Sequence, residues 1–180
     1  MKPTLRKAMP HEAGRAYDLF DRALRKLTNE GKAELFGGMT PEGVNNSLKG
    51  CNCIYLAERE GDRIPVSAVS ILRQPEKLTE YDELLEKTGM SGEKAILDAL
   101  AVRPELWGQG YGRQVIELCV EELRKTGVKI ALCIAHPSRE EMLRKIFKRA
   151  TGKDNIVSGE EYVWKTVENE RLRKKFVIEL

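Results

Sequence analysis

Several kinds of residue and segment that would mark a special class of protein are scarce in this sequence. There are only two histidines and four cysteines, and a lone Cys-x-Cys with two distant histidines has no recognisable metal-ligand spacing. We therefore expect no metal. No apolar run is long enough for a transmembrane helix, so we expect no membrane partner. The formal net charge of +3 is too small to indicate nucleic acid as a partner.

Features of exported and of disordered proteins are missing as well. The stretch MKPTLRKAMPHEAG lacks the apolar segment of a signal peptide, so we expect a cytoplasmic protein with reduced thiols at Cys51, Cys53, Cys119 and Cys133. No repeat, low-complexity segment or linker-like composition break is found. Hydrophobic residues at 41% and charged residues at 33% are ordinary for a globular protein. We expect residues 1–180 to form a single domain.

Hydrophobic periodicity predicts an alternation of strands and helices. Strands are expected over 5–9, 51–60, 64–72, 95–102, 128–135, 160–167 and 174–180, the second and third forming a hairpin around Glu60-Gly61-Asp62. Helices are expected over 10–31, 40–50, 81–87, 111–125 and 139–150. This order predicts an α/β or α+β fold, in which helices cover the faces of a sheet.

The segment LDALAVRPELWGQGYGRQVIEL, residues 97–118, places Gly108, Gly110 and Gly112 between a strand and a helix. A helix start has unpaired N–H groups and a partial positive charge, and glycines there let a phosphate approach the amides. The alternative is a glycine-rich turn that binds nothing. Two known phosphate-binding motifs do not match. The dinucleotide motif G-x-G-x-x-G needs its third glycine at the position of Arg113, and the G-K-[ST] of a P-loop does not follow.

The same segment resembles the acyl-CoA loop of the GNAT superfamily of N-acyltransferases, Arg/Gln-x-x-Gly-x-Gly/Ala after a strand ending in Leu-x-Val. The residues in register are Leu100, Val102, Pro104, Gly110 and Gly112, while Trp107 stands where Arg or Gln is usual. The resemblance implies a mixed, mostly antiparallel twisted sheet, splayed between 95–102 and 128–135 to admit acetyl-CoA. It also implies that the cofactor contacts Leu100, Ala101, Val102, Gly108, Gln109, Gly110, Tyr111, Gly112 and Arg113.

The implied chemistry is attack of a neutral amine on the thioester, with an N–H near Leu100 stabilising the oxyanion. Asp98 is the candidate general base, expected to share a face with Leu100 and Val102 and to have its pKa raised by burial. The alternative is a structural Asp98 that caps a neighbouring loop. Many family members protonate the leaving thiolate with a tyrosine, but Phe147 stands at that place. Water or Tyr111 would then take this role, or activity would be reduced.

Residues 75–93, PEKLTEYDELLEKTGMSGE, form a long connection rich in acids. We expect either a lid that favours a cationic acceptor or a surface helix packed through Tyr81, Leu84 and Leu85. His136 follows the strand 128–135 and could face the cleft, but a single histidine at a strand end is more often structural.

Two function classes remain. The first is an N-acetyltransferase that acts on the primary amine of a small molecule or peptide. The second is a non-catalytic acyl-CoA-binding sensor or interaction domain on the same fold, kept open by Phe147 and Trp107. A nucleic-acid-binding protein is a more distant third, which the mild charge argues against. A homodimer is left open.

Overall fold

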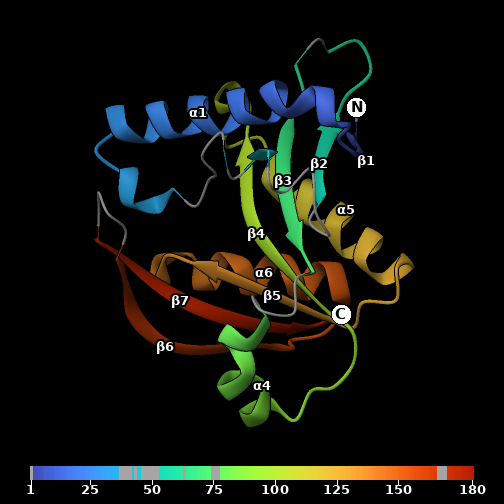
Figure 1. Ribbon diagram of the computed structural model, residues 1–180, viewed down its shortest axis with the longest axis vertical. Helices are drawn as coiled ribbons and strands as arrows, with labels where there is room; N and C mark the ends of the chain where they lie inside the picture. The colour runs from blue at the N-terminus through green and yellow to red at the C-terminus, as the bar shows by residue number, and fades with distance from the viewer. Residues whose placement is uncertain are drawn as a thin grey trace.

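The computed structural model is built around one mixed seven-stranded sheet with the order β1-β2-β3-β4-β5-β7-β6 (Figure 1). It describes residues 2–36, 42, 44, 45, 53–62, 64–73, 78–165 and 170–180. The strands are β1 (Thr4–Lys7), β2 (Cys53–Glu58), β3 (Ser67–Leu72), β4 (Lys94–Val102), β5 (Ile130–Ala135), β6 (Ile156–Lys165) and β7 (Glu170–Glu179). The helices are α1 (Ala13–Asn29), α4 (Asp82–Thr88), α5 (Tyr111–Lys125) and α6 (Glu140–Thr151).

The predicted strands and most of the predicted helices are confirmed. The helix predicted over 111–125 is α5 with the same bounds. The predicted hairpin is the antiparallel pair β2–β3, with Gly61 at a φ of 83° in its turn. Strand β6 begins earlier than predicted, because Ile156 and Val157 pair with the end of β7 before a bulge at Ser158. The helix predicted over 40–50 lies largely outside the described residues.

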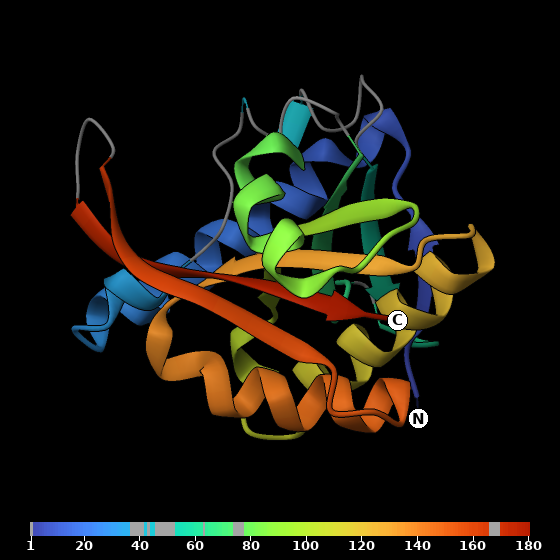
Figure 2. The same cartoon turned by 90° about the horizontal axis from the view of Figure 1, so that it is seen from below.

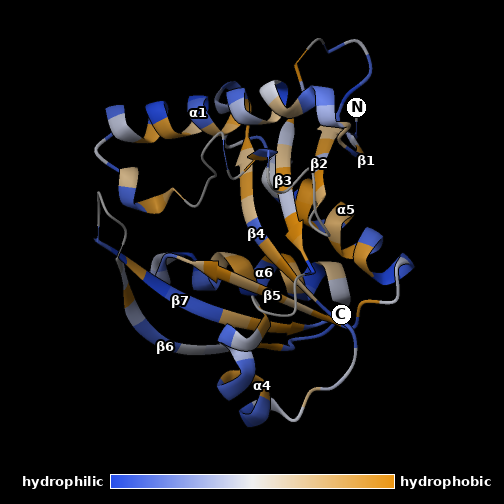
Figure 3. Ribbon diagram, in the orientation of Figure 1, coloured by the Kyte–Doolittle hydropathy of each residue, from blue (hydrophilic) through white to orange (hydrophobic). Residues whose placement is uncertain are grey.

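Helices cover both faces of the sheet. Helices α1 and α4 lie on one face, and α5 and α6 lie on the other (Figure 2). The apolar stripe of α1 faces the sheet and its polar side faces outward (Figure 3). Phe20 on α1 packs with Ala99 and Ala101 of β4, whereas α5 and α6 build a larger cluster that includes Phe147 and Phe176. Strands β2, β3 and β5 are therefore largely buried on both faces, which explains their nearly continuous apolar runs.

One pair of neighbouring strands is parallel and incompletely paired. Strands β4 and β5 pair in parallel from Lys94–Ile130 to Leu97–Cys133. Beyond this last pair β4 continues to Val102 and β5 continues to Ala135 without pairing to each other. The splay expected between these two strands is thus present, at the carboxyl ends where α/β sheets commonly bind ligands.

Candidate functional site

The glycine loop joins β4 to α5 through backbone that favours glycine. Gly108 and Gly110 have φ values of 78° and 81°, in the left-handed region where a Cβ is strained. Gly110 is the N-cap of α5 and is itself exposed, so the first amides of a four-turn helix open onto the surface here. Gly112 is the second residue of α5, where an added Cβ would meet only Val102 Cγ2 at 3.7 Å. The loop is therefore shaped to present amides rather than side chains.

A groove of about 640 Å³ runs from this loop along the end of β4. Residues from α1, such as Leu27, form one wall, and Met142 and Ile146 of α6 form the other. Eight residues expected to contact the cofactor line this groove: Leu100, Ala101, Val102, Gly108, Gly110, Tyr111, Gly112 and Arg113. Gln109 is not among the lining residues, since its side chain donates to the Glu105 carbonyl at 3.0 Å.

The backbone of β4 offers hydrogen-bonding groups to the groove. Arg103 N donates to Val66 O at 2.8 Å, which makes Arg103–Val66 a hydrogen-bonded pair of the antiparallel β3–β4 ladder. Because such pairs alternate, Ala101 also points its N–H and C=O toward β3. Leu100 and Val102 then direct theirs to the other side, where pairing with β5 has already ended. These residues can therefore pair with an extended ligand, whereas the Ala101 backbone cannot.

Asp98 lies at a β-bulge in β4, and two expectations for it are wrong. The β3–β4 register passes from Ile71–Leu97 to Ser70–Ala99, so Asp98 is the extra residue. The bulge switches the alternation, and Leu100 packs on the α5–α6 side while Ala99 packs on the α1 side. Asp98 therefore does not share a face with Leu100 and Val102. Its side chain is exposed rather than buried, although it lines the pocket at the splay.

This second pocket, of about 150 Å³, lies at the splay between β4 and β5. It shares Leu35, Leu100 and Arg139 with the groove, so the two cavities adjoin at the point where β4 and β5 separate. Its polar residues are Asp98, His136, Arg139 and Arg173. The buried Arg173 guanidinium donates to the carbonyls of Glu34 and Phe36 at 2.9 Å, which fixes the segment carrying Leu35 against β7.

Two cysteines line the pocket but are poorly suited to act as nucleophiles. Burial raises the pKa of the Cys133 thiol to about 12. The pKa of the Cys119 thiol is also raised to about 12, mainly by burial and to a smaller extent by the charge of Glu122. A thiol with such a pKa stays protonated near neutral pH, and the thiolate is the reactive form. The arrangement therefore favours direct transfer over a covalent cysteine intermediate.

His136 lines this pocket, which is the cleft-facing placement that its position after the strand left open. It follows β5 and precedes the 3-10 turn Pro137–Arg139. The Ser138 N–H donates to His136 Nδ1 at 3.3 Å, and the Ser138 hydroxyl lies 2.9 Å from the same nitrogen. With Nδ1 as the acceptor, the neutral ring carries its proton on Nε2. The only available signal was its position, one residue past the predicted buried strand. The hydrogen bond from Ser138 caps the 3-10 turn, which is a structural role as expected, and it leaves Nε2–H as a donor.

Neither of the aromatic residues considered for protonating the thiolate is placed to do so. Phe147 is buried in the pocket wall and has no proton to give. The Tyr111 hydroxyl accepts a hydrogen bond from Arg59 at 2.8 Å, and Tyr111 lines the groove rather than the pocket at the splay. The interpretation of Tyr111 as an acid therefore receives no support from the geometry.

The acidic segment 75–93 packs as a surface helix in its described part, 78–93. Tyr81, Leu84 and Leu85 are buried against the sheet, packing with Ile96 of β4 and Leu132 of β5. Glu83 pairs with Lys87 along the exposed side of α4 at 2.8 Å. No residue of 78–93 lines the groove or the pocket at the splay. The packing alternative therefore describes this helix, and the lid interpretation does not.

Searches for other kinds of site add little. Among the described residues, no group of three or more His, Cys, Asp or Glu side chains comes together as a metal site. Within the same residues, no helix has the length and apolarity needed to cross a bilayer.

Comparisons with known proteins agree with this geometry. The profile described as "Acetyltransferase (GNAT) family" matches residues 16–147, and no curated protein matches the sequence. The ribosomal-protein-S18-alanine N-acetyltransferase of Escherichia coli superposes with a TM-score of 0.66 at 13% identity, covering 98% of this chain and 93% of that one.

Two further solved structures show the same fold at low identity. A GNAT-family acetyltransferase from Listeria monocytogenes has a TM-score of 0.68 at 16% identity, covering 99% of this chain and 95% of that chain. One from Streptococcus pneumoniae has a TM-score of 0.62 at 12% identity and covers 99% of both chains. Together they confirm the expected mixed, mostly antiparallel sheet with flanking helices.

Proposed function

Since this chain belongs to the GNAT acetyltransferase family, we propose that it moves an acetyl group from acetyl-CoA to a primary amine by direct attack. The acceptor is a small molecule or a peptide. The observation that carries the proposal is that the glycine-loop groove adjoins the pocket with polar residues at the β4–β5 splay. One cavity suits a long phosphate-bearing donor, and the other suits the reacting groups.

In this proposal the groove holds the CoA moiety. The amides at the start of α5, from Gly108 to Arg113, bind the pyrophosphate, because a helix N-terminus favours anions. The Leu100 carbonyl and the Val102 N–H pair with the amides of the pantetheine arm, because the Leu100 N–H is left for the thioester oxygen and the Val102 carbonyl already accepts from Trp107 Nε1. Acetyl-CoA supplies an activated thioester, and its carbonyl then lies beside the bulge at Asp98.

The residues at the bulge carry the acyl transfer. The Leu100 N–H stabilises the oxyanion that forms when the amine nitrogen bonds to the thioester carbon. Asp98 takes a proton from the attacking amine, either directly or through a water, because its exposed carboxylate faces the pocket where the acceptor enters. The C–S bond then breaks and the sulfur leaves with the electron pair.

His136 stabilises the departing thiolate in place of a tyrosine. With Nδ1 held by the Ser138 amide, the neutral ring donates a hydrogen bond from Nε2 without giving up its proton. The thiolate can leave as an anion, since an ordinary thiol has a pKa of about 8.5. Phe147 is compatible with this chemistry, because no general acid is then required.

The direct test is turnover of acetyl-CoA with a panel of amines, followed by release of free thiol. The proposal requires amine-dependent release. A non-catalytic acyl-CoA-binding domain is the second candidate, favoured by the apolar Phe147 in the pocket wall. It predicts CoA binding without amine-dependent release for any acceptor.

A further inference from the structure

Resting on the proposed function, we infer that the site also accepts donors whose acyl chain is longer than acetyl, with the tail in the apolar end of the pocket at the splay. The pocket has two chemically different ends. Asp98, His136 and Arg139 form the polar end, where the groove joins it. The opposite end lies on the α5–α6 side of the sheet.

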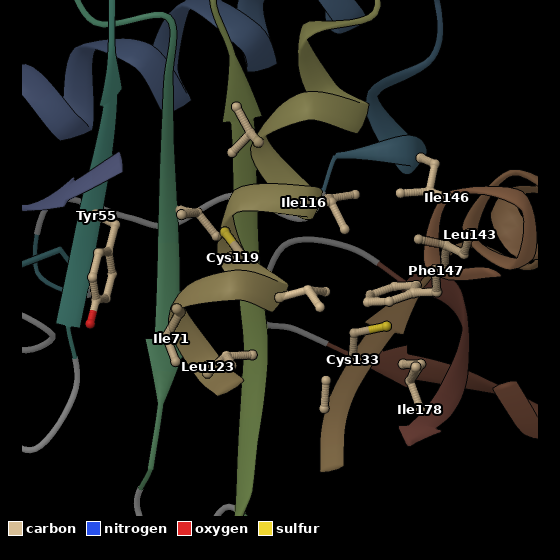
Figure 4. Packing of buried hydrophobic residues seen from close by; sticks show 14 of the residues in the cluster. Tyr55, Ile71, Ile116, Cys119, Leu123, Cys133, Leu143, Ile146, Phe147 and Ile178 are labelled. Atoms are coloured by element: carbon tan, nitrogen blue, oxygen red, sulfur yellow. The ribbon is translucent and has the colours of Figure 1, made fainter. Parts of the chain in front are cut away.

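That apolar end is lined from four elements. Val69 comes from β3, Cys133 from β5, and Ile116 and Cys119 from α5. Leu143 and Phe147 of α6 complete it. In Figure 4, Ile116 of α5 faces Leu143 and Phe147 of α6, Cys133 lies beside Phe147, and Cys119 lies on the side of α5 nearer β3. All of them belong to one buried hydrophobic cluster.

The chemistry of this lining suits a hydrocarbon. Both cysteines are protonated near neutral pH because burial raises their pKa values, so they act as small apolar side chains. Phe147 contributes a hydrocarbon ring where a tyrosine would place a hydroxyl. An apolar chain therefore loses no hydrogen bond on entering.

The volume exceeds what an acetyl group needs. The pocket measures about 150 Å³, and a protein cavity of roughly that size lined by Leu, Ile and Phe binds benzene, a six-carbon guest. An acetyl group brings a single methyl beyond its carbonyl. Protein interiors are otherwise close-packed, so a pocket of this total size that reaches between the sheet and the helices α5 and α6 is unusual.

The route into the apolar end is also defined. A thioester carbonyl at the Leu100 N–H lies where the groove and the pocket meet, since Leu100 lines both. The acceptor approaches from the exposed side, where Asp98 lies. The acyl tail then extends in the remaining direction, toward Cys119 and Phe147.

The test measures the affinity of the whole protein for CoA, acetyl-CoA, butyryl-CoA and hexanoyl-CoA by titration calorimetry, which requires no knowledge of the acceptor. Each methylene moved from water into an apolar site favours binding roughly fourfold. Butyryl-CoA should therefore bind on the order of tenfold tighter than acetyl-CoA. Equal or weaker binding of butyryl-CoA would overturn the inference.

Two variants on α5 locate the effect. Cys119→Leu adds bulk to the apolar end and should abolish the advantage of butyryl-CoA over acetyl-CoA. Val120→Ile is the matched control, because Val120 is fully buried on the same helix but does not line the pocket. It should keep the wild-type order of affinities. If both variants keep that order, the tail binds elsewhere and the inference is wrong.

Failure of the inference can be told apart from failure of the proposed function. If CoA itself does not bind, the proposed function fails. If CoA and acetyl-CoA bind and acetyl is transferred while longer chains bind progressively worse, only the inference fails. Should Cys119→Leu not fold, the wild-type affinity series still decides.

Discussion

The indole Nε1 of Trp107 donates a hydrogen bond to the Val102 carbonyl at 2.8 Å, joining the glycine loop to the end of β4. Its ring packs with the α1 cluster, and the Lys26 ammonium lies 5.5 Å from the ring centroid. Trp107 stands where related sequences usually have Arg or Gln. Here the Trp107 side chain holds the glycine loop against the end of β4, while the loop amides remain available to a ligand.

We expect Trp107→Phe to lower the free energy of unfolding by about 1 kcal/mol, because it keeps an aromatic ring and removes one hydrogen bond. Chemical denaturation measures the change. The control is Trp164→Phe, in which the side chain is 49% exposed on β6 and the expected change is within about 0.5 kcal/mol. Equal losses in the two variants would contradict a role for the Trp107–Val102 bond.

Asp98→Asn should lower kcat at neutral pH by about 100-fold, the range of general-base catalysis, and leave the affinity for acetyl-CoA nearly unchanged. The deficit should shrink at alkaline pH, where more of the acceptor amine is already neutral. The pH profile of kcat checks this. Asp82→Asn on α4 is the control, since Asp82 lines neither cavity. A loss that is independent of pH would reassign Asp98 to a structural role.

The two amide substitutions of His136 separate its two nitrogens. Asn places a polar atom near the Nδ1 position and keeps the cap on Ser138, whereas Gln places one near Nε2. If Nε2–H stabilises the thiolate, His136→Asn should lower kcat about 10- to 100-fold. His136→Gln should retain more activity despite losing the cap. The reverse ranking would show that only the cap matters.

Glu140 joins α6 to the C-terminal strands. It accepts hydrogen bonds from Lys174 at 2.8 Å and Ser158 at 2.9 Å, and these partners, Lys174 foremost, lower its pKa from 4.5 to about 2. A depressed pKa in the folded state gives stability that is present above pH 4.5 and is lost as the pH falls toward 2.

Glu140→Gln should therefore destabilise the protein at neutral pH by roughly 2 kcal/mol, the scale of a hydrogen bond to a charged group. The difference from wild type should narrow as the pH falls from 4.5 toward 2. Urea unfolding across this pH range measures it. Glu141→Gln, on the exposed side of α6, should change little at any pH. If the unfolding free energies of Glu140→Gln and wild type differ by the same amount at every pH, the ionised Glu140 carboxylate is not the source of the stability.

The sequence was informative where a local pattern determines structure. The apolar stripe from Val115 to Leu123 predicts α5, and alternating glycines before it predict the loop, because both depend on near neighbours. The bulge at Asp98 could not be predicted, since it depends on the register between β4 and β3. That single extra residue exposes Asp98 and turns Leu100 to the other face.

The pocket residues from distant segments were missed for the same reason. Arg173 reaches the pocket from β7, and Leu35 is held there by contacts between residues more than 130 positions apart. His136 was visible only as a strand-end residue. Sequence pattern alone does not indicate which side chains a splayed sheet brings together.

Calorimetric titration of CoA into the wild-type protein, Gly110→Asp and Gly127→Asp shows whether the glycine loop binds the donor. Gly110 and Gly127 flank the two ends of α5, and both have a φ of 81°, so the backbone strain of substitution is matched. A carboxylate at Gly110 would repel the pyrophosphate, a juxtaposition that costs several kcal/mol or more than ~100-fold in affinity. The account predicts that Gly110→Asp abolishes binding while Gly127→Asp binds CoA like wild type. Wild-type affinity in a folded Gly110→Asp protein would contradict it.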